Sequence, residues 1–147
     1  MPPEFPLYYT HQLTWTEGKK GRLSGTDLPA LEVATPPEFD GAPGFWSPEQ
    51  LFVASANACV MATFIAIAAN SKLVFKAYTS SATGKLEKVP SGGFQITEIV
   101  IKARIAIGQA KDKERAERVL IKAEENCLVS RSMKSRVIVE PEIAVAE

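Results

Sequence analysis

The sequence has few of the residues on which metal and nucleotide chemistry depend. Its 147 residues include a single histidine, His11, and only two cysteines, Cys59 and Cys127, so a zinc site built on two histidines is impossible. It also lacks a glycine-rich dinucleotide fingerprint and a Walker motif. These absences disfavour nucleotide-dependent enzymes, and we expect neither a metal nor a cofactor. The two thiols are left as the best candidates for chemistry.

The chain has no excess of charge of either sign. Lysine and arginine together number 17, and aspartate and glutamate also number 17, so no strong electrostatic field favours nucleic acid or an anionic membrane as a partner. The residues from Met1 to Pro6 do not resemble a signal peptide, which favours the cytoplasm. In that reducing compartment a permanent disulfide is disfavoured, whereas a transient catalytic or sensing disulfide is compatible with the sequence.

The stretch Leu51–Ala69 contains no charged residue, and Cys59 lies within it. Its length raises the question of a membrane span, but its polar residues and the lack of flanking basic anchors favour a central helix packed on all sides by protein. Ser47 as the cap, Pro48 at the first helical position and Gln50 form a Ser-x-x-Gln capping box that marks the helix start. Alanines at 54, 58, 62 and 66 form a narrow ridge, where another backbone can approach closely or ordinary tight packing can occur.

The remaining elements are predicted from the spacing of apolar residues. Alternation predicts strands, and a four-residue apolar spacing after Asp112 predicts a helix whose inward stripe includes Cys127. A lone histidine on an apolar strand face, such as His11, is more often a core residue than a catalytic one. The predicted strands are Leu7–Trp15, Arg22–Ser24, Leu31–Ala34, Phe75–Val89, Phe94–Ile107 and Arg136–Glu140.

The order is therefore strands, a long helix, a hairpin, an amphipathic helix and a strand. This order predicts an α+β class. A length of 147 residues is that of a single domain covering residues 1–147, which is expected to bury roughly 70% of its unfolded surface.

Two segments resemble the signature regions of the OsmC/Ohr family, the osmotically inducible and organic-hydroperoxide-resistance proteins. The first comprises residues 47–52 (SPEQLF) and 56–59 (ANAC), and the second comprises residues 123–130 (AEENCLVS). The order and spacing of strands, helices and cysteines resemble that family over nearly the whole chain. The resemblance implies an OsmC-like fold, with antiparallel strands around a long central helix, and an intertwined homodimer with a site at the subunit interface.

The same resemblance implies a peroxidase that reduces hydroperoxides. In this sequence Cys59 would be the peroxidatic thiol, Cys127 the resolving thiol, and Glu49 the acidic partner that orients a cation beside the thiolate. The reductant would be an external dithiol, of lipoyl type. The chemistry is consistent with these roles, because a buried thiol needs help to ionise and a sulfenic acid needs a second thiol to trap it.

The cation is the point at which the chain departs from the family. Relatives with peroxidase activity have an arginine in an early turn, and Lys19 most nearly matches it, with Arg22 as the alternative register. Arg131, after Cys127, is a third candidate. Lysine does not replace arginine fully, because an ammonium lacks the planar fork that holds two acceptors at once. Each of these three residues is also compatible with a solvated surface charge.

Glu49 lies ten residues before Cys59 on the predicted helix, which separates them by about 15 Å along the axis. A loop must therefore bring a cation between them, or Glu49 must serve Cys59 of a second subunit. A simpler role for Glu49 is to complement the helix dipole.

The apolar neighbourhood of Cys59 favours a bulky organic or lipid hydroperoxide over hydrogen peroxide, although core packing explains the same residues equally well. The candidate substrate contacts are Phe45, Trp46, Phe52, Met61 and Phe64. Two alternatives to a peroxidase stay open at this point. One is a non-catalytic dimer that binds an apolar ligand, and Lys19 in place of arginine favours this function. The other is a thiol-based redox sensor.

Overall fold

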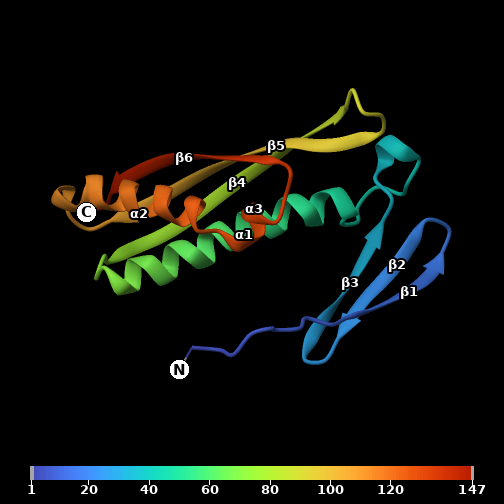
Figure 1. Ribbon diagram of the computed structural model, residues 1–147, viewed down its shortest axis with the longest axis horizontal. Coiled ribbons are helices and arrows are strands. Elements are labelled where there is room, and N and C mark those ends of the chain that lie inside the picture. Colours follow the sequence, from blue (N-terminus) through green and yellow to red (C-terminus); the bar gives the residue numbers. More distant parts are fainter. Residues whose placement is uncertain (1, 147) are drawn as a thin grey trace. The chain divides into compact units, whose positions relative to one another are not determined.

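The structure of the protein is a computed structural model that describes residues 2–146. The chain forms two compact units, one up to Leu51 and the other from Phe52 onward. The first unit contains β1 (Gln12–Glu17), β2 (Lys20–Gly25), β3 (Leu28–Ala34), a 3-10 turn (Pro37–Phe39) and the first turn of α1. The second contains the rest of α1 (Pro48–Asn70), β4 (Phe75–Lys88), β5 (Phe94–Ile107), a 3-10 turn (Ala110–Asp112), α2 (Lys113–Glu125), α3 (Leu128–Arg131) and β6 (Arg136–Val145). The α+β class expected from the sequence is confirmed (Figure 1).

The first unit is an antiparallel sheet in the order β1-β2-β3. Gly18 takes a positive φ of 52° in the turn between β1 and β2, and the Trp15 indole donates a hydrogen bond to its carbonyl oxygen (2.9 Å). The strand predicted from Leu7 begins only at Gln12, because Gln12 pairs with Ser24 and β2 ends one residue later. His11 precedes β1 and is exposed, so the expectation of a core histidine is wrong.

Helix α1 begins where the capping pattern predicted. The Gln50 N–H donates to the Ser47 hydroxyl (3.1 Å), which satisfies one of the free N–H groups of the first turn. A single stripe faces the core of the second unit, and it consists of Val53, Ala56, Val60, Phe64 and Ala68.

The opposite face of α1 is exposed within the chain, contrary to the expected packing on all sides. Met61 and Ile65 are 38% and 44% exposed, and the alanines at 58, 62 and 66 are exposed as well. The reason is that one sheet covers one face of a helix and leaves the rest uncovered. By length and composition alone α1 would fit a bilayer, but its polar side chains form hydrogen bonds within the protein, such as Ser80 to Asn57 (2.8 Å).

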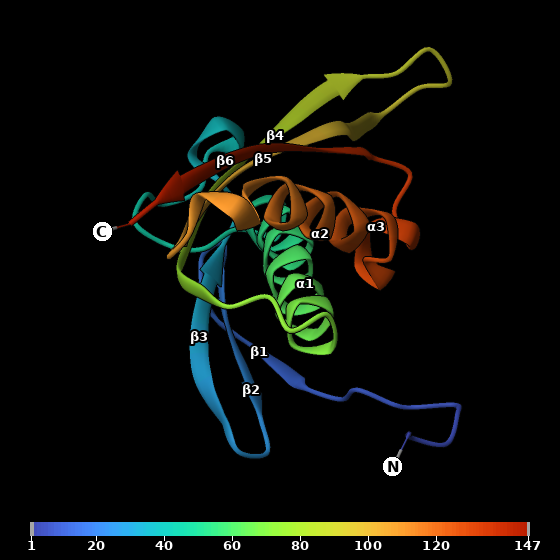
Figure 2. The same ribbon diagram turned by 90° about the vertical axis from the view of Figure 1, so that its left-hand side faces the viewer.

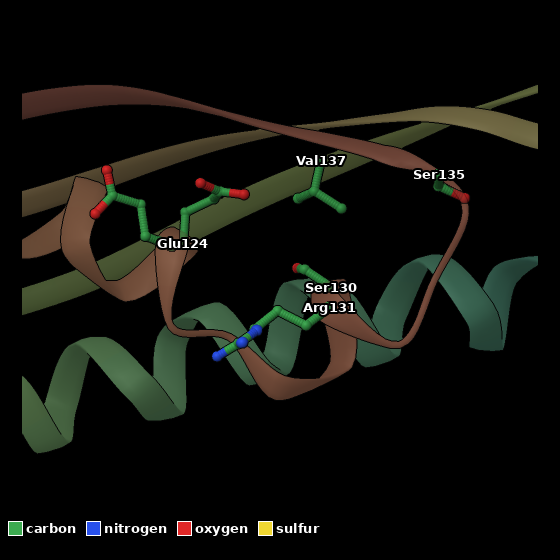
Figure 3. Close-up of a pocket in the computed structure, with 6 residues that line it drawn as sticks. Glu124, Ser130, Arg131, Ser135 and Val137 are labelled. Atoms are coloured by element: carbon green, nitrogen blue, oxygen red, sulfur yellow. The ribbon is translucent and has the colours of Figure 1, made fainter.

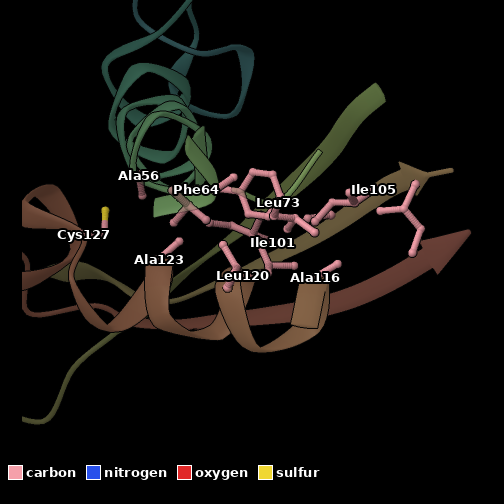
Figure 4. Close-up of a cluster of buried hydrophobic side chains, with 14 of the residues drawn as sticks. Ala56, Phe64, Leu73, Ile101, Ile105, Ala116, Leu120, Ala123 and Cys127 are labelled. Atoms are coloured by element: carbon pink, nitrogen blue, oxygen red, sulfur yellow. The ribbon is translucent and has the colours of Figure 1, made fainter. Parts of the chain in front are cut away.

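The second unit is built on the sheet β4-β5-β6, with α1 and α2 on one face of it (Figures 1 and 2). Strand β5 pairs antiparallel with β4 and parallel with β6. Its alternating residues form the centre of the core, and these are Ile99, Ile101, Ala103, Ile105 and Ile107. The last strand continues through Pro141 to Val145, five residues beyond the predicted end. Side chains of α1, β5 and α2 meet in one cluster (Figure 4).

Gly84 of β4 packs against Val53 of α1 without room for a side chain. A Cβ placed on Gly84 would lie 2.4 Å from Cγ2 of Val53, far inside van der Waals contact. We therefore expect Gly84→Ala to lower the free energy of unfolding by about 1–3 kcal/mol, because the helix must shift away from the sheet. Chemical denaturation measures the change.

Gly108→Ala is the matched control. The nearest atom to a Cβ at Gly108 is the flexible end of Lys76, at 3.4 Å, so the expected change stays within about 0.5 kcal/mol. Equal effects of the two substitutions would contradict the close packing at Gly84.

Candidate functional site

The two cysteines meet inside the second unit. Cys59 is in the middle of α1 and is half-buried, whereas Cys127 is fully buried. The apolar spacing predicted that Cys127 belongs to the inward stripe of α2, and this prediction is wrong. Helix α2 ends at Glu125, and Cys127 is the N-terminal cap of α3. Figure 4 shows its sulfur pointing toward the side on which α1 and Ala56 lie.

The thiols of Cys59 and Cys127 are hydrogen-bonded to each other, with Cys127 as the donor. Both cysteines are free, so this is the reduced pair. The two thiols are therefore near enough to influence each other's ionisation. The chain thus brings together the two residues that the sequence separates by 68 positions.

Three further polar groups lie beside the Cys59 sulfur. The backbone N–H groups of Leu128 and Val129, in the first turn of α3, and the side chain of Thr63 contact it. Thr63 Oγ1 lies 3.9 Å from the Cys59 sulfur and donates to the carbonyl oxygen of Cys59 (2.8 Å).

Hydrogen bonding determines the ionisation of the pair. Desolvation by burial raises the pKa of Cys59, but the bonds from Cys127, Val129, Thr63 and Leu128 together outweigh it and hold that pKa below the ordinary value of a thiol. Burial raises the pKa of Cys127, and its bond to Cys59 raises it further. Cys59 is therefore the thiol of the pair that ionises more readily.

We predict that Thr63→Val raises the pKa of Cys59, because valine keeps the shape of threonine but removes the hydroxyl. The measurement is the rate of Cys59 alkylation by iodoacetamide as a function of pH, followed by mass spectrometry. The midpoint should move to higher pH in Thr63→Val and return toward the wild-type value in Thr63→Ser. An unchanged midpoint in Thr63→Val would show that the hydroxyl has no part in ionisation.

None of the leading contributions to the pKa of Cys59 is a cation. In the first unit the Lys19 ammonium donates to the carbonyl oxygen of Phe39 (3.2 Å). Arg22 lies 3.6 Å from Glu32 in an exposed cross-strand ion pair, which is worth at most about 1 kcal/mol. Lys20, which the sequence did not single out, lies 4.9 Å from the centroid of the Phe45 ring.

Arg131, the third candidate cation, lies on a small pocket of the second unit, of about 150 Å³. Figure 3 shows its side chain with those of Glu124, Ser130, Ser135 and Val137. Burial and the neighbouring Glu125 raise the pKa of Glu124.

Glu49 and the aromatic pair before it belong to the first unit. One carboxylate oxygen of Glu49 is buried and has no hydrogen-bond partner among residues 2–146, a costly state for a carboxylate. Phe45 and Trp46 line a pocket of about 310 Å³ together with Gly44 and Gln50. Among the described residues, no group of three or more histidine, cysteine, aspartate or glutamate side chains is placed to hold a metal ion.

The other candidate substrate contacts lie on α1. Phe52 and Met61 are 37% and 38% exposed, whereas Phe64 is fully buried and packs on Phe75 and Tyr78, with ring centroids 5.1 and 5.3 Å away. In this chain Phe64 is a core residue.

Sequence reasoning missed the donors around Cys59. The position of Thr63, one helical turn after Cys59, is a signal that spacing alone provides. No sequence signal pointed to the N–H groups of Leu128 and Val129. Their position depends on the backbone of Cys127, which is extended (φ −70°, ψ 111°) and starts a new helix there.

Comparison with known proteins gives consistent results. The family model described as OsmC-like protein matches residues 41–142. An organic hydroperoxide resistance protein of Xanthomonas axonopodis pv. citri (strain 306) is 36% identical over 140 residues, which cover 92% of this chain and 93% of the relative. An organic hydroperoxide resistance protein-like 1 of Staphylococcus saprophyticus is 29% identical, with 95% of this chain and 97% of the relative covered.

Solved structures show the same fold. An OsmC-like protein of unknown function from Vibrio cholerae superposes with a TM-score of 0.82 at 21% identity and covers 92% of this chain and 100% of the other. A Legionella pneumophila protein, described as an organic hydroperoxide resistance protein OsmC, has a TM-score of 0.73 at 28% identity, with 95% and 100% covered.

Proposed function

The chain belongs to the OsmC-like protein family, and from this membership we propose that it is a thiol-dependent peroxidase that reduces organic hydroperoxides. The observation that carries the proposal is the hydrogen-bonded pair of Cys59 and Cys127. The names of the curated relatives support a role in resistance to organic hydroperoxides. We place the activity in the cytoplasm.

The reaction follows from the different ionisation of the two thiols. The Cys59 thiolate attacks the terminal oxygen of the hydroperoxide, the O–O bond breaks, and Cys59 becomes a sulfenic acid. The alkoxide that leaves takes up a proton from water and becomes the alcohol. Cys127 then attacks the sulfenic sulfur, and a disulfide forms as water is released. An external dithiol, of lipoyl type, restores both thiols by disulfide exchange.

The substrate in this proposal is a bulky organic hydroperoxide. Apolar side chains favour an apolar substrate by the hydrophobic effect. The candidates are Phe45 and Trp46 in the first unit and Phe52 and Met61 in the second, of which Trp46, Phe52 and Met61 are exposed. The aromatic pocket at Phe45 and Trp46 also suits an apolar ligand in a non-catalytic protein, which is the competing function.

Mass spectrometry after treatment with peroxide tests the proposal. Reduced protein mixed with one equivalent of cumene hydroperoxide should lose the mass of two hydrogens within seconds to minutes as the Cys59–Cys127 disulfide forms, while the peroxide is consumed. Cys59→Ser should abolish both changes, because serine cannot supply a thiolate.

Two other outcomes would favour the competing functions. An unchanged mass with the peroxide intact would sink the peroxidase and leave the ligand-binding protein. Disulfide formation that is not reversed by dihydrolipoamide would indicate a one-time redox sensor, since a peroxidase has to be reduced for the next cycle.

We also propose that the protein is a homodimer whose contact includes the exposed face of α1. That face is apolar and contains the exposed alanines at 58, 62 and 66 together with Phe52, Met61 and Ile65. A contiguous apolar surface of this kind is typical of an interface between chains. Small residues let a second backbone approach closely, and stable dimers bury about 800 Å² per partner.

The dimer would also explain the unpaired oxygen of Glu49. A buried carboxylate oxygen without a partner needs a donor, and within this chain no partner is present among residues 2–146. We propose that the donor is a cation at the assembled site, with Lys19 as the first candidate and Arg22 as the second.

The dimer is tested with two matched isoleucines. Ile65 on α1 and Ile121 on α2 are 44% and 45% exposed, but the exposed residues around Ile121 are mostly charged. Ile65→Lys should convert the protein to a monomer in sedimentation velocity, because a charge in an apolar contact is costly. Ile121→Lys should leave the dimer intact, and the opposite pattern would place the contact elsewhere.

A further inference from the structure

We propose that a pocket of the first unit binds the aromatic ring of a small uncharged ligand, and that Lys20 is the positioning residue that holds its wall in place. The pocket is lined by Gly44, Phe45, Trp46 and Gln50. In the proposed peroxidase function, on which this step rests, the substrate is then an aryl hydroperoxide rather than one with a long acyl chain.

The lining of the pocket favours an aromatic and uncharged ligand. Phe45 and Trp46 are aromatic, and Trp46 is 48% exposed. Aromatic rings attract one another through offset or edge-to-face contacts, beyond the gain from burying apolar surface. The lining residues carry no charge, so a charged head group would lose its water shell there without a counterion. The side-chain amide of Gln50 both donates and accepts hydrogen bonds and suits one polar group on the ligand.

The volume of the pocket limits the size of the ligand. It is about 310 Å³, at the low end of the roughly 300–1,000 Å³ that ligand pockets enclose. One ring with a short side chain fits this space. A long acyl chain would leave most of its length in water, where the hydrophobic effect contributes nothing to binding.

The backbone of the pocket is held in place by contacts within the first unit. The carbonyl oxygen of Trp46 accepts a hydrogen bond from the Ala34 N–H (2.9 Å), and Trp46 forms a bridge with Val33 of β3. On the other side, the Gln50 N–H donates to the Ser47 hydroxyl (3.1 Å). A preformed pocket of this kind loses less conformational freedom when a ligand binds.

Lys20 holds the Phe45 ring from outside the lining. Its ammonium lies over that ring, 4.9 Å from the centroid, within the reach of a cation–π contact. The same ammonium lies 3.4 Å from a carboxylate oxygen of Glu17. Glu17 thus helps to keep the ammonium over the ring and offsets its charge, so that the pocket does not become a site for anions.

Ligand binding is measured through the fluorescence of Trp46. The chain has two tryptophans, Trp15 and Trp46, so Trp15→Phe leaves a single reporter in the pocket. The probes are cumyl alcohol, which is the product of cumene hydroperoxide, and its counterpart with a saturated cyclohexyl ring in place of the phenyl ring. Cumyl alcohol should bind more tightly by about 2- to 10-fold, in line with the usual gain of an aromatic contact.

Variants of the pocket wall should change this affinity ratio. In the Trp15→Phe background, Phe45→Leu and Lys20→Met should bring the ratio close to one, because the first removes the ring and the second removes the cation that holds it. Lys20→Arg should keep the ratio, since a guanidinium also stacks on an aromatic face. Lys102→Met is the control for the loss of one positive charge, because Lys102 is an exposed residue of the second unit. It should leave the ratio unchanged.

The substrate class is tested with the same variants on the wild-type background. The ratio of kcat/KM for cumene hydroperoxide to that for tert-butyl hydroperoxide should fall in Phe45→Leu and Lys20→Met and recover in Lys20→Arg.

Four results would count against the proposal or its premise. No binding, or equal affinity for the two alcohols, would overturn the aromatic site. An affinity ratio that Lys20→Met leaves unchanged would overturn the positioning role of Lys20. A kcat/KM ratio that does not follow the affinity ratio would overturn the substrate class. Wild type that reduces neither hydroperoxide would overturn the peroxidase function, and the binding of the alcohols would then decide on the aromatic site alone.

Discussion

The packing of β5 against two helices is the constraint on which the cysteine pair depends. The inward residues of β5, from Ile99 to Ile107, lie under both α1 and α2. Cys59 belongs to α1, and Cys127 lies two residues after the end of α2. Because interiors are close-packed and resist rearrangement, the shared strand fixes the two helices relative to each other and keeps the two thiols near each other. The site is thus a product of the core, although its chemistry takes place at the edge of that core.

Local signals in the sequence predicted some elements closely. The start of α1 was predictable because Ser47, Pro48 and Gln50 act within one turn. Strand β5 was predictable because apolar residues recur at every second position from Ile99 to Ile107. Other features depend on partners that are distant in sequence. The strand around Leu7 to Trp15 is cut short by the end of β2, and the parallel pairing of β6 is a property of two strands and a connection, which neither strand reveals alone.

The candidate site was also predictable only in part, because some of its contacts come from residues distant in sequence. The family resemblance identified both cysteines, but the apolar spacing after Asp112 placed Cys127 on a continuous helix. The break at Asn126 and Cys127 changes the chemistry, since it turns the N–H groups of Leu128 and Val129 toward Cys59. These hydrogen bonds lower the pKa of Cys59, which is the role that was expected of a cation at Lys19, Arg22 or Arg131.

Pro141 in β6 has a consequence for how the protein behaves at high concentration. In the order β4-β5-β6 the last strand is at the edge of the sheet, and edge strands offer free backbone groups to which other chains add. Proline has no N–H to offer, and Glu140 and Glu142 stand on either side of Pro141. Interruption by proline and negative charge are two ways in which natural edge strands avoid such pairing. The β6 edge is therefore protected against the addition of further strands, which would lead to aggregates. Association between chains is then expected at the exposed face of α1.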